Sequence, residues 1–417
     1  MTLAKVLMTG TMEQVLIGLD DIRIRTRDRQ AVLEKPVQND TFQGKNVLPD
    51  GVDGLDDIKG QVKPDGWGRI KNAELICVNT VKNIYQLSSE SIQSIAAIYD
   101  SGVLLSRGVQ VVSVTDLLST APQIGQYNFV LSDVKGAFIR LSSAPSGRIT
   151  SDFDGITRFT GWPSSASQIM RDILLSRSTL TADDLCEADF SAIHALRPWV
   201  CGLYVSEDSS IPDLLDALAT SCGCWWGFDR LGKVRIKPVM TPSGNPEVTF
   251  RTFDGSAVRD TDSDIISLDI SATRDQGRGI PYWRVRVGYD RCWTVQSSSD
   301  LAAAADRQID FTGQDYRYVE KSDSEIKYLH PSSSDLLVQT LITASGDAES
   351  LASDLSGLYG QRRQIVKVTA EMSARIADKI DLGTVVSIKI NRFGWDSGKS
   401  FLSYARNWVT PVSGGVL

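Results

Sequence analysis

The segment from Ala73 to Val114 constrains the fold most, because apolar β-branched stretches alternate there with turn signals at short intervals. The stretches with strand-like composition are Leu75–Val78, Ile95–Tyr99 and Val109–Val112. Between them stand the turn signals Asp100-Ser101-Gly102 and Ser106-Arg107-Gly108. Short strands at this spacing are typical of a β-sandwich or a barrel. The segment therefore predicts a β-rich N-terminal part.

Length and charge limit the remaining possibilities. A chain of 417 residues has room for several domains at roughly 150 residues each. Its 44 Lys and Arg residues against 51 Asp and Glu residues give a net charge of −7. This argues against a dedicated nucleic-acid-binding protein, which usually carries a basic face. No stretch reaches the ~18 uninterrupted apolar residues of a membrane span. Because Met1–Gly10 is too weak for a secretory signal, we expect folding in a cytoplasm and no stable membrane insertion.

Helical patterns first appear after residue 150. Ser164–Ser176 places its apolar residues at helical spacing and predicts a short amphipathic helix. A second helix is predicted over Ser209–Cys222, since a serine can cap its start, Pro212 lies in its first turn and Gly223 follows its end. Residues 225–236 then predict a hairpin around an Asp-Arg-Leu-Gly turn.

Two further β-rich regions are indicated by strand and turn signals. Near the N-terminus, short strands are predicted at Leu16–Leu19 and Ile22–Thr26, and Pro-Asp-Gly turns at residues 49–51 and 64–66. The C-terminal half has strand patterns at Trp283–Tyr289, Ile365–Met372, Thr384–Ile390 and Phe401–Val409, and helix patterns at Asp300–Arg307 and Asp347–Gln361.

We therefore expect a multidomain, β-rich α+β protein. The predicted parts are an N-terminal β-rich domain over residues 1–150, an α/β domain over residues 151–232, and a C-terminal β-rich domain over residues 233–417 that contains the helix at 347–361.

Histidine and cysteine patterns give little support for catalysis or metal binding. The chain has two histidines, His194 and His330, and we interpret both as hydrogen-bonded or surface side chains. Cys222 and Cys224 form a Cys-x-Cys pair, but a zinc site usually needs a second pair or histidines. A turn of small buried residues is the favoured interpretation, with a metal or redox pair as the alternative. Since the six cysteines are scattered along the chain, we expect free thiols.

Two more motifs fail on their spacing. Asp260–Asp264 begins like a calcium-binding loop, but Ile265 and Ser271 stand where an EF-hand needs Gly and Glu. We interpret it as a solvated acidic loop, with a weak surface cation as the alternative. Gly394–Ser400 resembles a phosphate loop, but it has three residues between its glycines instead of four, and it predicts a hairpin turn. We therefore predict no enzyme activity, no catalytic residue, no metal site and no cofactor.

Several stretches in a fixed order, from residue 56 to the C-terminus, carry a resemblance. They lie at residues 56–72, 84–105, 147–155, 225–235, 287–296 and 382–401. The residues singled out within them are Lys63, Pro64, Gly68, Arg69, Asn72, Tyr85, Gln86, Asp152, Gly155, Trp226, Gly227, Gly232, Gly383, Phe393 and Gly394. The first stretch is similar to the "Lys-Gly-x-x-Lys-Pro … Gly-Arg-x-x-Asn" segment of one family. Together the stretches resemble the tail-hub (minor tail, tail-tip) proteins of long-tailed bacteriophages and gene transfer agents. None is a catalytic signature, so the resemblance implies a structural role and assigns no individual role to these residues.

The resemblance implies a homotrimer that closes the distal end of a phage tail tube. Each subunit would contribute two barrel-like β domains, so that three subunits meet a sixfold tube while keeping threefold symmetry for the tip. The implied partners are a distal tail protein, a tape-measure protein and a central fibre or tail-tip protein. Phage DNA would pass through transiently, and an acidic wall would hold its phosphates less tightly than a basic one. The implied location is the virion tail tip, after assembly in the host cytoplasm.

Two alternatives remain at this point. A receptor- or carbohydrate-binding tail protein could use some of the nine tryptophans, such as Trp67 in a predicted turn, to stack on sugars. Against this, Trp225, Trp283, Trp293 and Trp408 lie in strand patterns typical of core or interface anchors. A cell-wall hydrolase would need an acid with a raised pKa and a partner carboxylate in a cleft.

Overall fold

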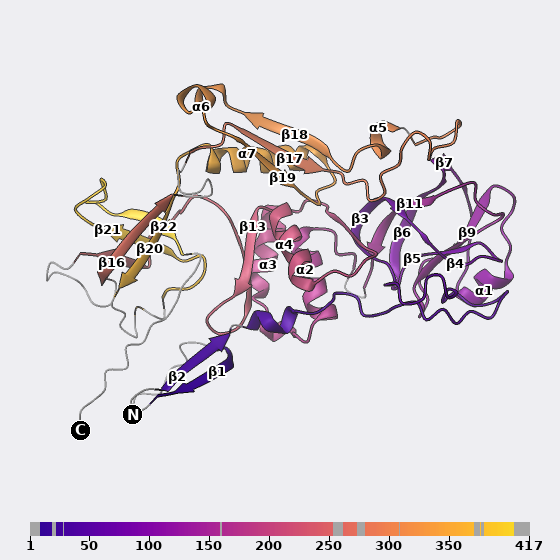
Figure 1. Ribbon diagram of the computed structural model, residues 1–417, viewed down its shortest axis with the longest axis horizontal. Coiled ribbons are helices and arrows are strands. Elements are labelled where there is room, and N and C mark those ends of the chain that lie inside the picture. The colour runs from indigo at the N-terminus through magenta and orange to yellow at the C-terminus, as the bar shows by residue number, and fades with distance from the viewer. Residues whose placement is uncertain are drawn as a thin grey trace.

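The computed structural model describes residues 9–18, 22–27, 29–158, 161–252, 262–272, 280–307, 309–370, 376 and 379–403. Strands outnumber helices in this part of the chain, and the helices are segregated from most of the strands, which confirms the β-rich α+β class. Figure 1 shows an elongated molecule with N-terminal β-sheets at one end, a C-terminal sheet at the other and helices between them.

Two five-stranded sheets share a core in the N-terminal part. The first has the order β12-β3-β11-β6-β7, with β3 (Asp65–Glu74), β6 (Ile92–Asp100), β7 (Val103–Leu104), β11 (Ile149–Ile156) and β12 (Gly202–Val205). The second has the order β4-β5-β10-β9-β8, with β4 (Ile76–Asn79), β5 (Ile84–Ser88), β8 (Ser106–Gln110), β9 (Gln126–Val130) and β10 (Ala137–Leu141). Ile70 and Phe153 of the first sheet are buried in one cluster with Leu87 and Phe129 of the second. This burial supplies the main stabilisation of the two sheets.

A short helix and a loop cover the second sheet on its other face. Helix α1 (Val114–Ser119) begins after Ser113, whose hydroxyl accepts a hydrogen bond from the Asp116 N–H. Its Leu117 is buried with Phe42 from the preceding loop and Phe138 from β10.

Three helices and a hairpin form the centre of the molecule. They are α2 (Ala166–Arg177), α3 (Glu187–Leu196), α4 (Ile211–Ser221), β13 (Cys224–Phe228) and β14 (Val234–Pro238), with the short 3₁₀ turns η1 (Arg29–Leu33) and η2 (Ala182–Asp184). Ser210 caps α4 by accepting a hydrogen bond from the Asp213 N–H. Ile169 of α2 and Leu215 of α4 are fully buried in one core, as amphipathic helices require.

A three-stranded sheet with one long helix adds to this central core. Its order is β18-β17-β19, with β17 (Arg284–Tyr289), β18 (Arg317–Ser322) and β19 (Asp335–Gln339), and the helices of this region are α5 (Ile309–Thr312), α6 (Ser324–Leu329) and α7 (Ser345–Tyr359). Val285 and Val287 alternate along β17 and are buried with Leu351 of α7. Figure 1 shows α7 running along this sheet.

The C-terminal sheet has its own apolar cluster. Its order is β20-β16-β15-β21-β22, with β15 (Val248–Arg251), β16 (Asp262–Ala272), β20 (Gln364–Ala370), β21 (Val385–Lys389) and β22 (Lys399–Leu402). Strand β15 runs parallel to both of its neighbours. Ile388 and Trp395 are buried there, with Phe250 packed against them.

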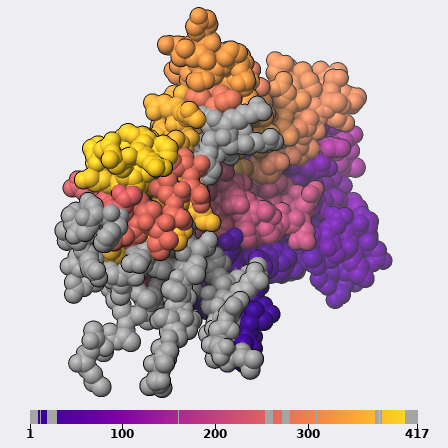
Figure 2. All heavy atoms as spheres, turned by 60° about the vertical axis from the view of Figure 1, so that its left-hand side comes forward, coloured from indigo at the N-terminus to yellow at the C-terminus, as the bar shows by residue number. Residues whose placement is uncertain are grey.

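A separate hairpin, which we name the arm, is formed by β1 (Thr11–Ile17) and β2 (Ile22–Arg27). It protrudes from the body of the molecule in Figures 1 and 2. Just before the arm, the Thr9 N–H donates a hydrogen bond to the Arg230 carbonyl at 2.7 Å. The arm therefore starts from the turn between β13 and β14.

Most of the predicted elements are confirmed within a few residues. The helices predicted at 164–176, 209–222 and 347–361 are α2, α4 and α7, and the hairpin predicted at 225–236 is β13–β14. The turn predicted at residues 49–51 is present, with the Asp50 N–H bonded to the Val47 carbonyl. Of the strand predicted at Phe401–Val409, only the residues up to 403 are described, so Trp408 lies outside them.

Four predictions are wrong. The turn signal at Ser106-Arg107-Gly108 lies instead within β8, which pairs with β9. No helix forms over Asp300–Arg307, because the Ala302 and Arg307 N–H groups bond to the carbonyls of Ser101 and Gly102 instead of to their own segment. Residues 64–66 are not a turn, since Asp65 begins β3. Trp67 therefore lies on a strand, and it is fully buried.

The predicted domain borders fall inside continuous structure. The border at 150/151 lies within β11, which pairs with both β3 and β6. The border at 232/233 lies in the turn between β13 and β14, which pair with each other. The three-domain division and the barrel-like nature of its β domains stay predictions. Within the described part of the chain, no helix has the length and apolarity needed to cross a bilayer.

Candidate functional site

Two glycines bring β3 and β12 into unusually close contact. Gly68 has a φ of +65°, and a Cβ placed on it would lie 1.9 Å from the Cys201 carbonyl oxygen. Opposite it, a Cβ on Gly202 would lie 1.8 Å from the Arg69 carbonyl oxygen. The Arg69 N–H donates to the same Cys201 carbonyl at 2.9 Å. Only glycine at both positions permits this backbone approach.

A second close approach joins β3 to β11. A Cβ on Gly155 would lie 2.2 Å from the Gly66 carbonyl oxygen. On the neighbouring pair of residues, Arg69 binds Asp154 with 3.0 Å between Nε and Oδ1. The backbones of β12, β3 and β11 are thus packed tightly around one short stretch of β3.

Asn72 and Asp152 connect this stretch to a distant loop. The Asn72 N–H donates to Asp152 Oδ1 at 2.8 Å, and the Arg307 guanidinium binds the other oxygen of Asp152. The Asn72 side-chain amide donates to the Thr294 carbonyl at 2.7 Å and to Gln296 Oε1 at 3.1 Å. Asn72 is fully buried with a φ of +54°, a conformation that Asn tolerates better than most residues. We name Gly68, Arg69, Asn72, Asp152 and Gly155 the strand junction.

Next to the strand junction, five charged side chains form a chain of ion pairs that the sequence analysis missed. Arg177 of α2 binds Asp65 of β3 at 2.5 Å and Glu90 at 2.6 Å. Arg158 binds Glu90 at 2.5 Å and Asp172 of α2 at 2.5 Å. This Asp65 network holds α2 against the edge of the N-terminal sheets.

Asp65 is the most deeply buried member of the network. Burial raises its pKa to about 6, and the opposing charge of Arg177 and a hydrogen bond from Ser89 offset part of that shift. The Gln38 side-chain amide also donates to it, at 2.8 Å. A buried acid with a raised pKa is a common feature of hydrolase sites. Here, however, the carboxyl is fully buried and bonded to Gln38, Ser89 and Arg177, so it is not exposed to a substrate.

Lys63 and Pro64 hold the loop that leads into β3. Lys63 forms an ion pair with Asp53 at 3.0 Å. The Pro64 carbonyl accepts a hydrogen bond from the Ser89 N–H at 2.7 Å. Both contacts are structural and lie within the N-terminal part.

Tyr85 and Gln86 lie on β5 and point into packed surroundings. Tyr85 pairs with Cys77 of β4, and burial raises its pKa, with the neighbouring Cys77 adding to the effect. The Gln86 amide donates to the Lys135 carbonyl at 3.1 Å. Neither side chain is available to a ligand from solvent.

Trp226 and Gly232 belong to the β13–β14 hairpin. The Trp226 indole N–H donates to Asp216 of α4 at 2.7 Å. Gly232 has a φ of +80° in the turn, and its carbonyl accepts a hydrogen bond from Arg29 at 2.9 Å. These contacts join the hairpin to α4 and to the segment that follows the arm.

Gly227 and Gly383 mark a contact between this hairpin and the C-terminal sheet region. A Cβ on Gly227 would lie 3.5 Å from Leu382, and one on Gly383 would lie 3.2 Å from the Trp225 ring. Gly383 has a φ of +81°, so it also supplies a turn that other residues rarely adopt.

Phe393 and Gly394 lie in the turn between β21 and β22. Phe393 has a φ of +61° and is 64% exposed, and its ring lies 5.5 Å from the buried Trp395. Gly394 has a φ of +72° with open space beyond it. The prediction of a hairpin turn over residues 394–400 is confirmed, and no helix follows these glycines.

The histidines and the Cys-x-Cys pair have structural surroundings. His194 Nδ1 lies 2.9 Å from the Ser165 hydroxyl at the start of α2, and the His330 N–H caps α6. The Cys222 and Cys224 thiols donate to backbone carbonyls at 3.5 Å and 3.1 Å. Both cysteines are buried, and the interaction with the neighbouring Cys224 thiol together with burial raises the pKa of Cys222. Within the described ranges, no group of three or more His, Cys, Asp or Glu side chains is placed to hold a metal ion. The acidic motif at 260–264 is described only from Asp262, so it lies partly outside these ranges.

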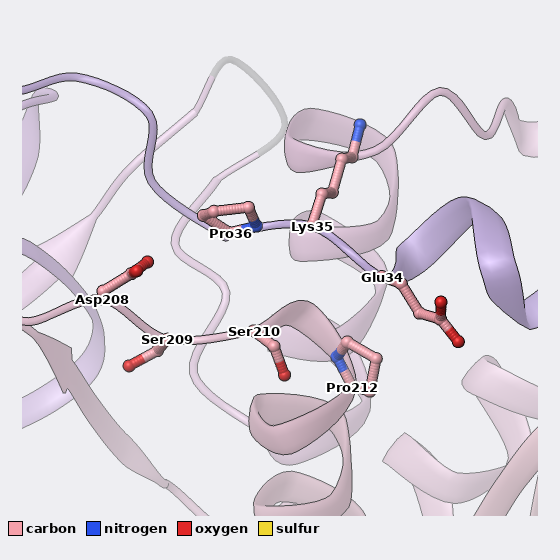
Figure 3. A pocket seen from close by; sticks show the side chains of 7 residues that line it. All are labelled: Glu34, Lys35, Pro36, Asp208, Ser209, Ser210 and Pro212. Atoms are coloured by element: carbon pink, nitrogen blue, oxygen red, sulfur yellow. The ribbon is translucent and has the colours of Figure 1, made fainter.

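A shallow hollow of about 350 Å³ lies at the start of α4 (Figure 3). It is lined by Glu34, Lys35, Pro36, Asp208, Ser209, Ser210 and Pro212. Its two walls are hydrogen-bonded to each other, from the Val37 N–H to the Ser209 carbonyl at 2.9 Å and from the Ile211 N–H to the Lys35 carbonyl at 3.2 Å. In Figure 3 the Glu34 and Asp208 carboxylates stand far apart and do not converge. The hollow therefore has no arrangement of groups suited to catalysis.

Comparison with solved structures returned 23 similar chains, three of which follow. No protein-family model and no curated protein matches the chain. A chain in the virion of a native gene transfer agent particle is similar over 80% of this chain and 80% of its own length, with 11% identity and a TM-score of 0.43. A tail protein from Neisseria meningitidis MC58 covers 67% of this chain and 72% of itself, with 13% identity and a TM-score of 0.30. A 43 kDa tail protein of prophage MuSo2 from Shewanella oneidensis covers 82% and 90%, with 9% identity and a TM-score of 0.31. Since the TM-scores of these three structures are below 0.5, we assign neither family nor function from them.

Proposed function

We propose that the chain is a structural virion protein, the trimeric hub of a phage tail tip. In this role three copies close the distal end of the tail tube and adapt its sixfold symmetry to a threefold tip. The hub then opens for DNA ejection. Its partners are a distal tail protein, a tape-measure protein and a central fibre or tail-tip protein.

One observation carries the proposal. The residues that resemble tail-hub proteins come from separate stretches, yet several of them meet at two places in the fold. Gly68, Arg69, Asn72, Asp152 and Gly155 form the strand junction. Gly227 and Gly383 lie at the contact between the β13–β14 hairpin and the C-terminal region. Residues used for backbone packing and buried hydrogen bonds suit a protein whose function is its shape.

The overall charge is compatible with a conduit for DNA. A lumen that bound phosphate through many Lys and Arg contacts would hold the genome by a strong, salt-dependent attraction. With a net charge of −7, the chain does not provide an excess of such contacts. The DNA can then slide through without being retained.

The alternatives receive less support from the described residues. Trp67, the candidate for sugar stacking in a turn, is fully buried, and its indole N–H donates to Asp172 at 2.9 Å. The acid with a strongly raised pKa, Asp65, is enclosed by the Asp65 network. Neither a sugar-binding platform nor a hydrolase cleft is favoured by these positions.

Cryo-electron microscopy of the particles tests the proposal directly. We expect three copies of the chain at the distal end of the tail tube. Six copies along the tube, copies only on lateral fibres, or no copy in the particle would contradict it. A parallel zymogram on host envelope and a glycan array on purified protein are expected to be negative, and a positive result would favour one of the alternatives.

A further inference from the structure

The long connection between β17 and β18 crosses over to the first N-terminal sheet. Its beginning is fixed on β3, where the Asn72 side-chain amide donates to the Thr294 carbonyl at 2.7 Å. Its base is closed by the Gln296 N–H, which donates to the Thr312 carbonyl at 2.9 Å, and both of these residues are fully buried. The connection therefore leaves from a base that is anchored in the core.

Beyond this base the connection lies on the surface. We name Ser297–Arg307 the flap. None of its eleven residues is buried, and six of them are exposed. Its first turn is closed within the flap, because the Ser297 N–H donates to the Asp300 carboxylate at 2.8 Å. A segment that buries so little apolar surface opens at a lower free energy than the core beneath it.

Backbone hydrogen bonds hold the flap on the turn between β6 and β7. The Ala302 N–H donates to the Ser101 carbonyl at 2.8 Å. The N–H groups of Asp306 and Arg307 both donate to the Gly102 carbonyl, each at 3.0 Å. Three bonds thus join the flap to two neighbouring residues.

Two charged side chains of the flap add to these bonds. The Arg307 guanidinium binds Asp152 of β11 and lies over the Tyr99 ring, 4.3 Å from its centroid. The Asp306 carboxylate accepts a hydrogen bond from the Leu104 N–H of β7 at 2.8 Å. In Figure 1 the orange chain beside α5 lies next to β7.

The Asp306 carboxylate occupies the outer edge of the first sheet, since β7 is the last strand of that sheet. The Leu105 N–H donates inward to the Ile98 carbonyl of β6 at 2.9 Å, so the preceding Leu104 N–H points outward. An outward N–H on an edge strand is a template for pairing with another strand. The flap therefore stands where an added strand would have to bind.

We propose that the flap opens as one unit while the sheets beneath it stay folded, and that this opening uncovers the outer edge of β7. The bonds of the flap are concentrated on the β6–β7 hairpin and the adjoining Asp152, so the loss of one bond weakens the others. The inference concerns contacts within one chain. It holds or fails independently of the hub proposal, and it can be tested on the isolated protein.

Hydrogen exchange of the complete protein, measured by mass spectrometry at single-residue resolution, tests this inference. Four amides report on the flap because their N–H groups are bonded across its contact with the sheet: Leu104, Ala302, Asp306 and Arg307. We expect the same equilibrium constant for opening at all four. It should exceed that of the amides of β10, the central strand of the second sheet, by about a hundredfold or more.

Asp306→Ala shows whether the flap acts as a unit. The variant removes the acceptor of the Leu104 N–H, and we expect the opening constants of all four amides to rise together by about tenfold. The matched control is Asp133→Ala, which removes a comparable bond from the Val114 N–H to a carboxylate, 3.1 Å long, at the start of α1. This control is expected to leave exchange in the flap unchanged.

Arg307→Ala gives a second measure, because it removes the ion pair with Asp152. We expect the same joint rise at the four amides, with exchange of β10 unchanged. Exchange of the four amides only together with β10 would mean that the flap does not open by itself, and it would overturn the inference. Opening constants that differ among the four amides, or faster exchange of Leu104 alone in Asp306→Ala, would overturn it as well.

Discussion

Replacing Gly68 by alanine is the sharpest test of the strand junction. An alanine at this position is destabilised in two ways. Its backbone is strained at a φ of +65°, and its Cβ would lie 1.9 Å from the Cys201 carbonyl oxygen. Two nearby glycines isolate these two effects. Gly60 has a φ of +81° with nothing within 4 Å of a Cβ, whereas Gly202 has the close approach to Arg69 and no positive φ. The three alanine variants therefore form a matched set.

The expected losses of unfolding free energy differ between the three variants. Gly60→Ala loses about 1–2 kcal/mol of unfolding free energy, because only the left-handed backbone conformation is strained. Gly202→Ala forces β12 away from β3, and the loss of two or three hydrogen bonds at roughly 1 kcal/mol each gives about 2–3 kcal/mol. Gly68→Ala combines both effects, and we expect about 3–5 kcal/mol. This is a large part of the ~5–15 kcal/mol that stabilises a typical domain.

Urea unfolding followed by tryptophan fluorescence measures these losses, because Trp67 is fully buried beside Gly68. With an m-value of about 2 kcal/mol/M, the midpoint falls by about 1.5–2.5 M for Gly68→Ala and by about 0.5–1 M for Gly60→Ala. Limited proteolysis near β12 provides an independent readout. If Gly68→Ala lost no more than Gly60→Ala, the close approach of β3 and β12 would be refuted.

Three further predictions concern titration, thiols and nucleotides. Burial raises the pKa of Asp65 from 3.8 to about 6, so the folded chain binds this proton more tightly and stability falls as the pH rises from about 4 to 6. In Asp65→Asn we expect this pH-dependent loss of unfolding free energy to be smaller by about 2–3 kcal/mol, as measured by urea unfolding at several pH values in this range. An unchanged dependence of stability on pH would contradict the raised pKa of Asp65. Thiol labelling should reach the half-buried Cys77 and Cys186 first in the native protein and all six cysteines after denaturation, whereas missing thiols would indicate a disulfide or a bound metal. We expect the protein neither to hydrolyse ATP or GTP nor to bind them saturably. Nucleotide binding that is lost in Lys399→Ala would overturn the interpretation of residues 394–400 as a turn.

Local signals predicted α2 and α4 of the central region well, whereas α3 was not predicted. For α4, a capping serine, a proline in the first turn and a glycine after the end all lie within one short segment. Such signals act between near neighbours in the sequence, so no tertiary information is needed to interpret them. The same holds for α7, whose apolar residues Ala348, Leu351, Ala352 and Leu355 repeat at helical spacing and are buried.

Signals that depend on distant partners were misread. A Pro-Asp-Gly sequence favours a turn in isolation, but Asp65 begins β3 because Arg177, Gln38 and Ser89 satisfy its carboxylate. None of these partners can be identified from the residues around Asp65. For the same reason the Asp65 network, which joins β3 to α2, was not predicted at all.

The pairing of β3 with β12 shows why domain borders are hard to infer from sequence. Strand β12 follows α2 and α3 in the chain, so composition assigns it to the central α/β region. In the structure it is an edge strand of the first N-terminal sheet, joined to β3 through Gly68 and Gly202. A glycine in a strand pattern is locally only a weak point or a bulge. Gly68 allows the close backbone approach only because Gly202 faces it on β12. The N-terminal region and the central region therefore share one sheet. A division of the chain that separates them would leave β3 with an unprotected edge, and this is the reason to express and test the chain whole.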